Sequence, residues 1–195
     1  MRIAVCLAVA MAVALAAGAA QAVTITFDDL AAGTVLTNQY AGVTFSNPLA
    51  GGLFANTATP GPPFSAPMAI QPVNYRASGN YNLAVFDLWA TSVSVVMGDF
   101  DGDEDVLHLE AYDAGNNLLA SDVQVLPAPV NGGLVLLVSA SNIAYVQFYG
   151  RGGGVNSVYF DNFTFDAGVV PEPLTALGLV AGAGALAGYL RRRKA

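Results

Sequence analysis

The stretch that decides the fold is DVLHLEAYDAGNNLLASDVQVL, residues 105–126 of a 195-residue chain. Apolar and polar side chains alternate through its first half, as they do in a strand with one buried face. Leu107 and Leu109 would face a core, and His108 and Glu110 would face solvent. The next five residues, DAGNN, are turn formers, and a second strand-like run follows them. The stretch therefore predicts a β-hairpin.

The same alternation recurs on both sides of this hairpin, without helical periodicity between residues 23 and 167. Residues 47–80 contain six prolines and are expected to form long loops with at most edge strands, because proline cannot donate to a central ladder. Eight to ten short strands, each with one apolar face, close most simply as a sandwich. The expected strands are residues 23–27, 42–46, 83–89, 91–98, 105–113, 118–126, 133–139, 143–150 and 156–166.

The last of these segments changes the phase of its alternation. Phe160 and Phe163 are both apolar but stand three positions apart. A β-bulge at Asp161–Asn162 would explain the change and would re-aim the carboxylate of Asp161.

Charge is distributed unevenly along the chain. Of 14 acidic residues only Glu172 falls outside residues 23–167, and of seven basic residues only Arg76 and Arg151 fall inside, so this body carries a net charge of −11. Such a surface repels nucleic acid, which excludes it as a partner. Cys6 is the only cysteine, so disulfides cannot stabilise the body.

The densest acidic cluster is DFDGDED, residues 99–105. Aspartates at alternate positions can turn their carboxylates around one oxygen-preferring cation, which predicts Ca²⁺ as a structural cofactor. A solvated turn between two strands is the alternative. The predicted ligands are Asp99, Asp101, Asp103 and Asp105.

The two cations of the body each stand beside a tyrosine. Tyr75 precedes Arg76, and Tyr149 lies two positions before Arg151. An aromatic ring next to a guanidinium can stack on a sugar and bind its hydroxyls, so these four residues are the predicted carbohydrate site. Alternatively, both arginines only neutralise neighbouring acids.

Catalysis finds little support in the residues, and the chain is expected not to be an enzyme. His108 is the only histidine, and no Ser-His-Asp order or catalytic cysteine can be built around it. Paired carboxylates for glycoside hydrolysis stay open as an alternative because acids are abundant.

Residues 1–22 have the three parts of a secretory signal peptide. Arg2 supplies the positive start, residues 3–17 are an unbroken apolar run, and Ala20-Gln21-Ala22 offers small residues for cleavage before Val23. We expect a signal-peptide helix that is removed by signal peptidase, with an uncleaved anchor as the alternative.

Residues 168–195 contain a motif, an apolar run and a basic end. The run, residues 174–190, would as a helix cover about 25 Å, the short end of what crosses a bilayer. This order closely resembles the PEP-CTERM sorting signal of Gram-negative bacteria. The resemblance implies a C-terminal transmembrane helix, an exosortase-type membrane protease as partner, and transient residence in the inner membrane before the cell surface or exterior. The motif is Pro171, Glu172 and Pro173, and the basic stop is Arg191, Arg192, Arg193 and Lys194.

The body resembles the galactose-binding-like family in three stretches: ITFDDL, GDFDGDEDVLHLEAYDAGNNLLASD and VYFDNFTF. The resemblance implies an all-β jelly-roll β-sandwich over residues 23–167. It also implies a structural Ca²⁺ held by acids near both ends of the domain, at Asp28 or Asp29 and at Asp161.

These observations predict an exported, non-catalytic protein of the cell surface or extracellular matrix, associated with exopolysaccharide or biofilm. A carbohydrate-binding module with a defined sugar site is the alternative, and a secreted glycan-active enzyme is a third hypothesis.

Overall fold

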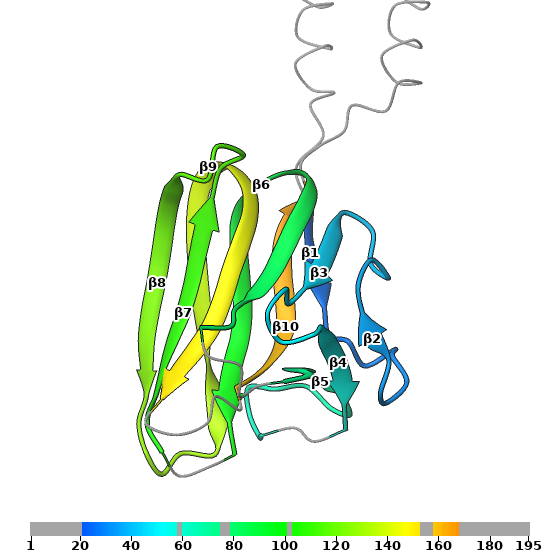
Figure 1. Ribbon diagram of the computed structural model, residues 1–195, viewed down its shortest axis with the longest axis vertical. Coiled ribbons are helices and arrows are strands. Elements are labelled where there is room, and N and C mark those ends of the chain that lie inside the picture. Colours follow the sequence, from blue (N-terminus) through cyan, green and yellow to red (C-terminus); the bar gives the residue numbers. More distant parts are fainter. Residues whose placement is uncertain (1–20, 58–59, 75–78, 101–102, 153–157, 168–195) are drawn as a thin grey trace, which may run out of the picture. The chain divides into compact units, whose positions relative to one another are not determined.

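The computed structural model describes residues 21–57, 60–74, 79–100, 103–152 and 158–167 (Figure 1). Residues Ala22–Gly168 form one compact unit. Most of the predicted signal peptide and the whole predicted sorting signal lie outside the described residues, as do Tyr75, Arg76 and Asp101. Within the described ranges, no helix has the length and apolar character needed to span a membrane.

The described residues form β-strands and contain no α-helix, so the all-β prediction is confirmed. The strands in chain order are β1 (Gln21–Ile25), β2 (Val35–Leu36), β3 (Val43–Ser46), β4 (Leu53–Asn56), β5 (Ala69–Pro72), β6 (Asn82–Asp99), β7 (Asp105–Tyr112), β8 (Leu118–Leu126), β9 (Gly132–Gly152) and β10 (Tyr159–Ala167).

The predicted hairpin is present as β7 and β8. The two strands pair antiparallel, with Leu107 opposite Gln124. Leu107 and Leu109 are fully buried, whereas His108 and Glu110, which alternate with them, are partly exposed, as the alternation predicted. The Asp113 carboxylate accepts hydrogen bonds from the backbone N–H groups of Gly115 at 2.8 Å and Asn117 at 2.9 Å, which fixes the turn.

Strands β6 and β9 form a long antiparallel ribbon that organises the sheet. They pair from Asn82 opposite Phe148 to Asp99 opposite Gly132. The pairing becomes irregular between Val85 and Ser92, where the ribbon bends at the upper end of the body in Figure 1. The sequence predicted two separate strands in each of these segments. In the structure each segment is instead one continuous strand, which bends at this point and remains paired with the other.

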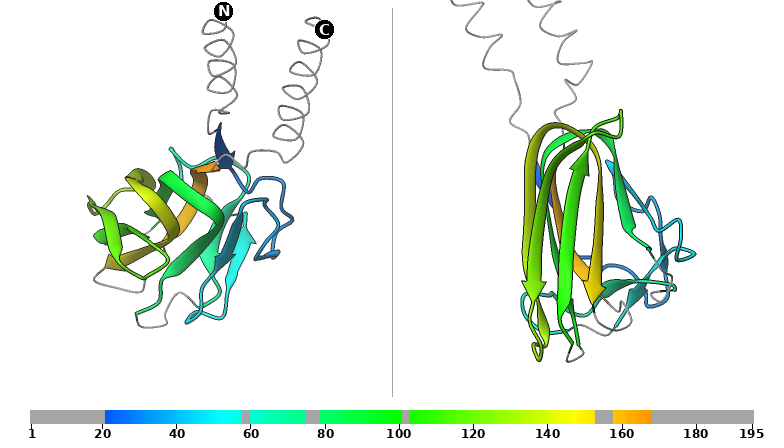
Figure 2. Two further views of the ribbon diagram at one scale, coloured as in Figure 1. Left: turned by 90° about the horizontal axis from the view of Figure 1, so that it is seen from above. Right: turned by 60° about the vertical axis from the view of Figure 1, so that its left-hand side comes forward.

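The bend divides the sheet into two layers (Figures 1 and 2). The first half of β6 carries β3, and the second half of β9 carries β7 and then β8. The second half of β6 carries β10, which is followed by β5, β4 and β2, and β1 also pairs with β10.

Phenylalanines from the two layers meet in the core. Phe45 of β3 contacts Phe163 of β10 edge to face, with ring centroids 5.0 Å apart. Phe148 of β9 contacts Phe160 of β10 in the same way at 4.8 Å. These contacts are favourable arrangements for buried rings, so the two layers pack as a sandwich.

One expectation for residues 47–80 is wrong. Strand β5 is not at an edge, because it pairs with β4 on one side and with β10, through Ile70, on the other. All four of its residues are buried. The proline argument failed because Pro72 is the last residue of the strand, where the missing N–H costs little.

The predicted bulge in β10 is confirmed. The register between β10 and β6 shifts between Asp161 and Thr164, and Asn162 has a φ of 47°. Phe160 and Phe163 are both fully buried as a result. Asparagine tolerates this left-handed backbone conformation better than most residues do.

Candidate functional site

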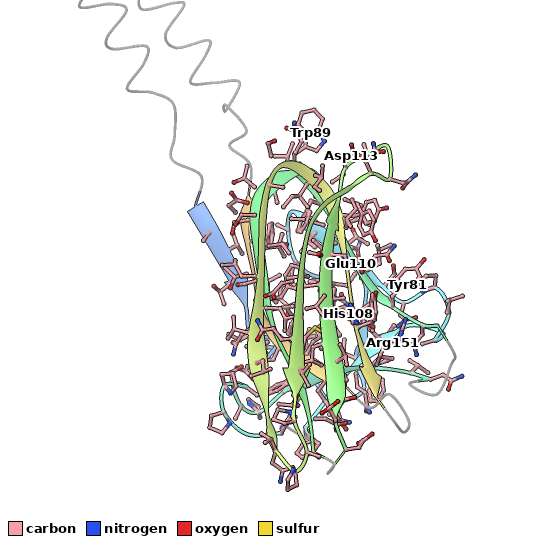
Figure 3. All side chains as sticks on the ribbon, turned by 90° about the vertical axis from the view of Figure 1, so that its left-hand side faces the viewer. Tyr81, Trp89, His108, Glu110, Asp113 and Arg151 are labelled. Atoms are coloured by element: carbon pink, nitrogen blue, oxygen red, sulfur yellow. The ribbon has the colours of Figure 1, made fainter. Side chains whose placement is uncertain are left out.

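The outward surface of β7 and the second half of β9 gathers aromatic and polar side chains. The register places His108 opposite Tyr149, Glu110 opposite Gln147, and Tyr112 opposite Tyr145. Figure 3 shows His108, Glu110 and Arg151 along this side of the molecule. We call this surface the β7–β9 face; it consists of His108, Glu110, Tyr112, Tyr145, Gln147, Tyr149 and Arg151.

Two pairs of rings stand side by side on this face. His108 and Tyr149 are stacked with ring centroids 4.6 Å apart and planes 14° from parallel. Tyr112 and Tyr145 are stacked at 5.0 Å and 8°. The Arg151 guanidinium also lies 4.2 Å from the centre of the Tyr149 ring. Two groups therefore already lie against the Tyr149 ring, so a ligand would meet ring edges and hydroxyl groups before it met a flat platform.

Glu110 links the two aromatic pairs. Its Oε1 accepts a hydrogen bond from the Tyr149 hydroxyl at 2.9 Å, and its Oε2 accepts one from the Tyr112 hydroxyl at 2.6 Å. Burial and the bond to Glu110 raise the pKa of both phenols, so they stay protonated and keep donating. The carboxylate therefore holds two rings in fixed positions.

The other polar groups of the face differ in how far they are engaged. Burial lowers the pKa of His108, which outweighs the opposite effect of Glu110, so its imidazole is neutral at pH 7 and has one donor and one acceptor. Arg151 donates through Nη1 to the carbonyls of Asn80 and Gly150 and retains further N–H groups. The Tyr145 hydroxyl donates to Asn116 at 3.0 Å. The face thus offers donors and acceptors in close alternation.

The structure brings two of the four predicted sugar-binding residues, Tyr149 and Arg151, to this face. The predicted sugar site did not include the other five residues of the face, which are His108, Glu110, Tyr112, Tyr145 and Gln147. The alternation in residues 105–112 predicted that Glu110 and its neighbours face outward. It could not predict that β9 is the partner of β7, because this pairing joins residues about 40 positions apart.

The acidic loop brings three of its four predicted ligands together. Asp99 ends β6 and Asp105 begins β7, and one carboxylate oxygen from each of Asp99, Asp103 and Asp105 lies within 4.8 Å of the others. Asp99 and Asp105 are buried. Convergent carboxylates of this kind suit an oxygen-preferring cation such as Ca²⁺.

The acids predicted as a second metal site accept hydrogen bonds from other parts of the chain. Asp161 Oδ2 accepts hydrogen bonds from the Ser65 N–H at 2.6 Å and the Ser65 hydroxyl at 2.8 Å. Asp28 accepts one from the Met68 N–H at 3.0 Å, and Asp29 accepts one from the Tyr40 hydroxyl. Among the described residues, these three carboxylates do not form a convergent group like that of the acidic loop.

Asp161 and Asp28 therefore fasten the proline-rich segment around Ser65 to the core. Asp161 is fully buried. Burial raises its pKa to about 6, although the bonds from Ser65 and Asn162 act in the opposite direction.

No protein-family model and no curated protein matches the chain. Several solved structures resemble it at low identity. A DUF4465 family protein from Bacteroides caccae is 10% identical, with 75% of this chain and 99% of that chain covered and a TM-score of 0.48. The C-terminal family 22 carbohydrate binding module of Clostridium thermocellum Xyn10B is 13% identical, with 76% and 95% covered and a TM-score of 0.46.

An arabinose-bound GH51 α-L-arabinofuranosidase is 11% identical, with 73% of this chain covered and a TM-score of 0.47. The chain spans only 26% of the length of that enzyme. Because these identities are 10–13% and the TM-scores are below 0.5, the comparisons do not indicate a function, and we infer the function from the β7–β9 face itself.

Proposed function

We propose that this chain is a non-catalytic carbohydrate-binding protein with its sugar site on the β7–β9 face. The observation that carries the proposal is the position of Glu110, whose two oxygens hold phenols from two stacked aromatic pairs. The result is a row of ring edges and hydroxyl groups on the outside of a sheet, with two of the phenols held in place by Glu110. Side chains fixed before binding lose little entropy when a ligand arrives.

Sugars match this surface because each hydroxyl group both donates and accepts hydrogen bonds. The phenol oxygens of Tyr112 and Tyr149 donate their hydrogens to Glu110 and can still accept. The neutral imidazole of His108 and the remaining N–H groups of Arg151 can donate. A linear glycan lying along the face would meet these groups in turn.

Binding is favoured over hydrolysis by the state of Glu110. A glycosidase needs one carboxyl group that gives a proton and a second that attacks or activates water. Glu110 already accepts hydrogen bonds at both oxygens, so its role on the face is to position Tyr112 and Tyr149.

Neutral glycans are the preferred class. The body carries a net charge of −11, and a carboxylate stands in the middle of the face. Uronic acids and sulfated sugars would be repelled by this field.

We further propose that the body is a jelly-roll sandwich that is exported through its signal peptide and then processed by an exosortase-type protease at residues 171–173. The tripartite ends of the sequence support this. Exopolysaccharide outside the cell is then the natural partner of the face. A purely structural role in the matrix is the competing hypothesis.

Titration calorimetry of residues 22–168 with neutral oligosaccharides, selected on a glycan array, tests the sugar site. We expect saturable binding that Tyr149→Phe weakens roughly ten-fold, because one hydroxyl that positions the ligand is lost. Tyr40→Phe is the matched control, since it removes a phenol that also donates to a carboxylate, Asp29, away from the face. Absence of saturable binding, or equal losses in both variants, would favour the structural role.

A further inference from the structure

The bend of β6 carries two exposed apolar side chains at one end of the body. Leu88 is 45% exposed and Trp89 is 62% exposed, while the next residue, Ala90, is fully buried and anchors the bend. Figure 3 shows Trp89 at one end of the described body. Leu88 and Trp89 are neighbours in the sequence, and both expose apolar surface at this end of the body.

The first and last strands of the body reach the same end. In Figure 1 the start of β1 and the end of β10 both lie beside the bend of β6. The Asp166 carboxylate accepts hydrogen bonds from the N–H groups of Thr91 at 2.6 Å and Ser92 at 2.9 Å, which fastens the end of β10 to the bend. The chain therefore leaves the body next to Leu88 and Trp89.

The sequence beyond β10 limits how far this end can be from a membrane. Only six residues, 168–173, separate Ala167 from the apolar run 174–190. Six residues span at most about 20 Å when fully extended. While the run is in a bilayer, the bend of β6 must therefore remain close to the membrane surface.

We infer that this end of the body, with Leu88 and Trp89 at its tip, inserts into the headgroup boundary of the bilayer before the chain is processed. The inference rests on the proposed export and membrane residence of the chain, and not on the sugar site. Tryptophan is enriched at this boundary because its ring is apolar and its N–H can still reach water.

Charge selects the kind of lipid. Asp87 directly precedes Leu88, and Figure 3 shows Asp113 near the same end. These carboxylates and the net charge of the body would be repelled by anionic headgroups. The fitting partner is a zwitterionic bilayer surface, with phosphatidylcholine as the probe.

Trp89 is the only tryptophan of the chain, so its fluorescence reports this contact directly. The full chain is reconstituted into phosphatidylcholine vesicles whose acyl chains either carry bromine, which quenches tryptophan on contact, or do not. We expect brominated lipid to lower the Trp89 emission roughly two-fold, as for a ring at the interface. Leu88→Asp should remove most of this quenching, because it places a charge at the tip.

A double variant, Trp89→Phe with Val125→Trp, is the matched control. Val125 is 50% exposed and lies near the end of β8, whereas the Asp113–Asn117 turn precedes the start of that strand. Seven residues, 118–124, separate Val125 from this turn. We expect little quenching of this tryptophan. Equal quenching at both positions, or none at Trp89, would overturn the inference while leaving the anchor intact. A chain that does not sediment with the vesicles would overturn the anchoring premise and the inference together, and the calorimetric test of the sugar site would be unaffected.

Discussion

Glu110 fixes the positions of two tyrosine rings on the outer surface of the sheet. It stands at the centre of the β7–β9 face and holds Tyr112 and Tyr149 through separate oxygens. Each phenol is also stacked against a ring of the neighbouring strand. Cross-strand pairs of this kind stabilise a sheet by a few tenths of a kcal/mol to about 1 kcal/mol each. The contacts that position the rings of the face therefore also stabilise the sheet.

Glu110→Gln should free one of the two tyrosine hydroxyls on the β7–β9 face and lower the stability of the fold. An amide has one acceptor oxygen in place of two, so one phenol loses its partner, and we expect the free energy of unfolding to fall by about 1 kcal/mol. The pKa of Tyr112 should also fall toward its ordinary value, since Glu110 helps to raise it. Urea unfolding and ultraviolet titration of the tyrosines measure the two effects. If the phenol titration does not change, Glu110 does not hold the rings as described.

Asp161 makes the stability of the body depend on pH. Its folded pKa of about 6 lies above the ordinary value of 3.8, so the folded chain binds a proton that the unfolded chain has released. The stability due to this proton is fully present below about pH 4 and is lost as the pH rises through about 6.

Asp161→Asn removes this titration. Relative to the variant, the free energy of unfolding of the wild type should decline between pH 4 and pH 7 by up to about 3 kcal/mol. This amount follows from the difference between the folded pKa of about 6 and the ordinary value of 3.8. Urea unfolding at intervals of one pH unit, in the presence of a chelator, measures the difference. A difference that grows with pH would show that Asp161 favours its charged form, as a metal ligand does.

At the scale of the elements, the ribbon of β6 and β9 decides where every other strand lies. One half carries β3, β7 and β8, and the other half carries β10 and the strands beyond it. The two strands approach so closely near one end that side chains do not fit between them. A Cβ atom on Gly98 would lie 1.9 Å from the carbonyl oxygen of Gly132.

Gly98→Ala should therefore be strongly destabilising. The clash is with backbone, which cannot move aside without breaking the ladder, and we expect a loss of roughly 3 kcal/mol or more in the free energy of unfolding. Gly115→Ala in the hairpin turn is the matched control, because the atoms nearest to its Cβ would belong to the side chains of Asn117 and Asp113, and the nearest of them would be 3.0 Å away. Thermal unfolding of both variants measures the contrast, and similar losses would contradict the close approach of β6 and β9.

For the whole molecule, the distribution of charge bears on stability as well as on partners. A body of net charge −11 without cysteines has no disulfides to offset the repulsion between its acids. The convergence of Asp99, Asp103 and Asp105 concentrates this repulsion at one end of β6 and β7.

We propose that Ca²⁺ relieves this repulsion. The melting temperature should rise when Ca²⁺ is added and fall when it is chelated, because a ligand of the native state stabilises that state. Asp103→Asn should abolish the response to Ca²⁺ and should leave the melting temperature in chelator unchanged or higher. Calorimetric scans of both proteins with and without Ca²⁺ decide the question, and a wild type that does not respond would dismiss the metal.

The sequence predicted the secondary structure where the alternation was local. The β7–β8 hairpin, the outward phase of His108 and the bulge at Asp161–Asn162 all follow from neighbours within a few residues. It failed for β5, a four-residue strand inside a proline-rich segment, and for the continuity of β6 and β9 through their bend. In both cases the deciding contacts are with strands that are distant in sequence.

Composition and alternation by themselves determined an acidic, cysteine-free, all-β body and, in strands such as β7, which side chains face solvent. Only the tertiary structure decided which of those side chains meet. Glu110 lies 39 residues from Tyr149, and Asp161 lies 96 residues from Ser65. The physical reason is that the packing of the whole core sets the order and register of the strands. The sequence around an exposed residue therefore does not predict which residues of the next strand will lie beside it.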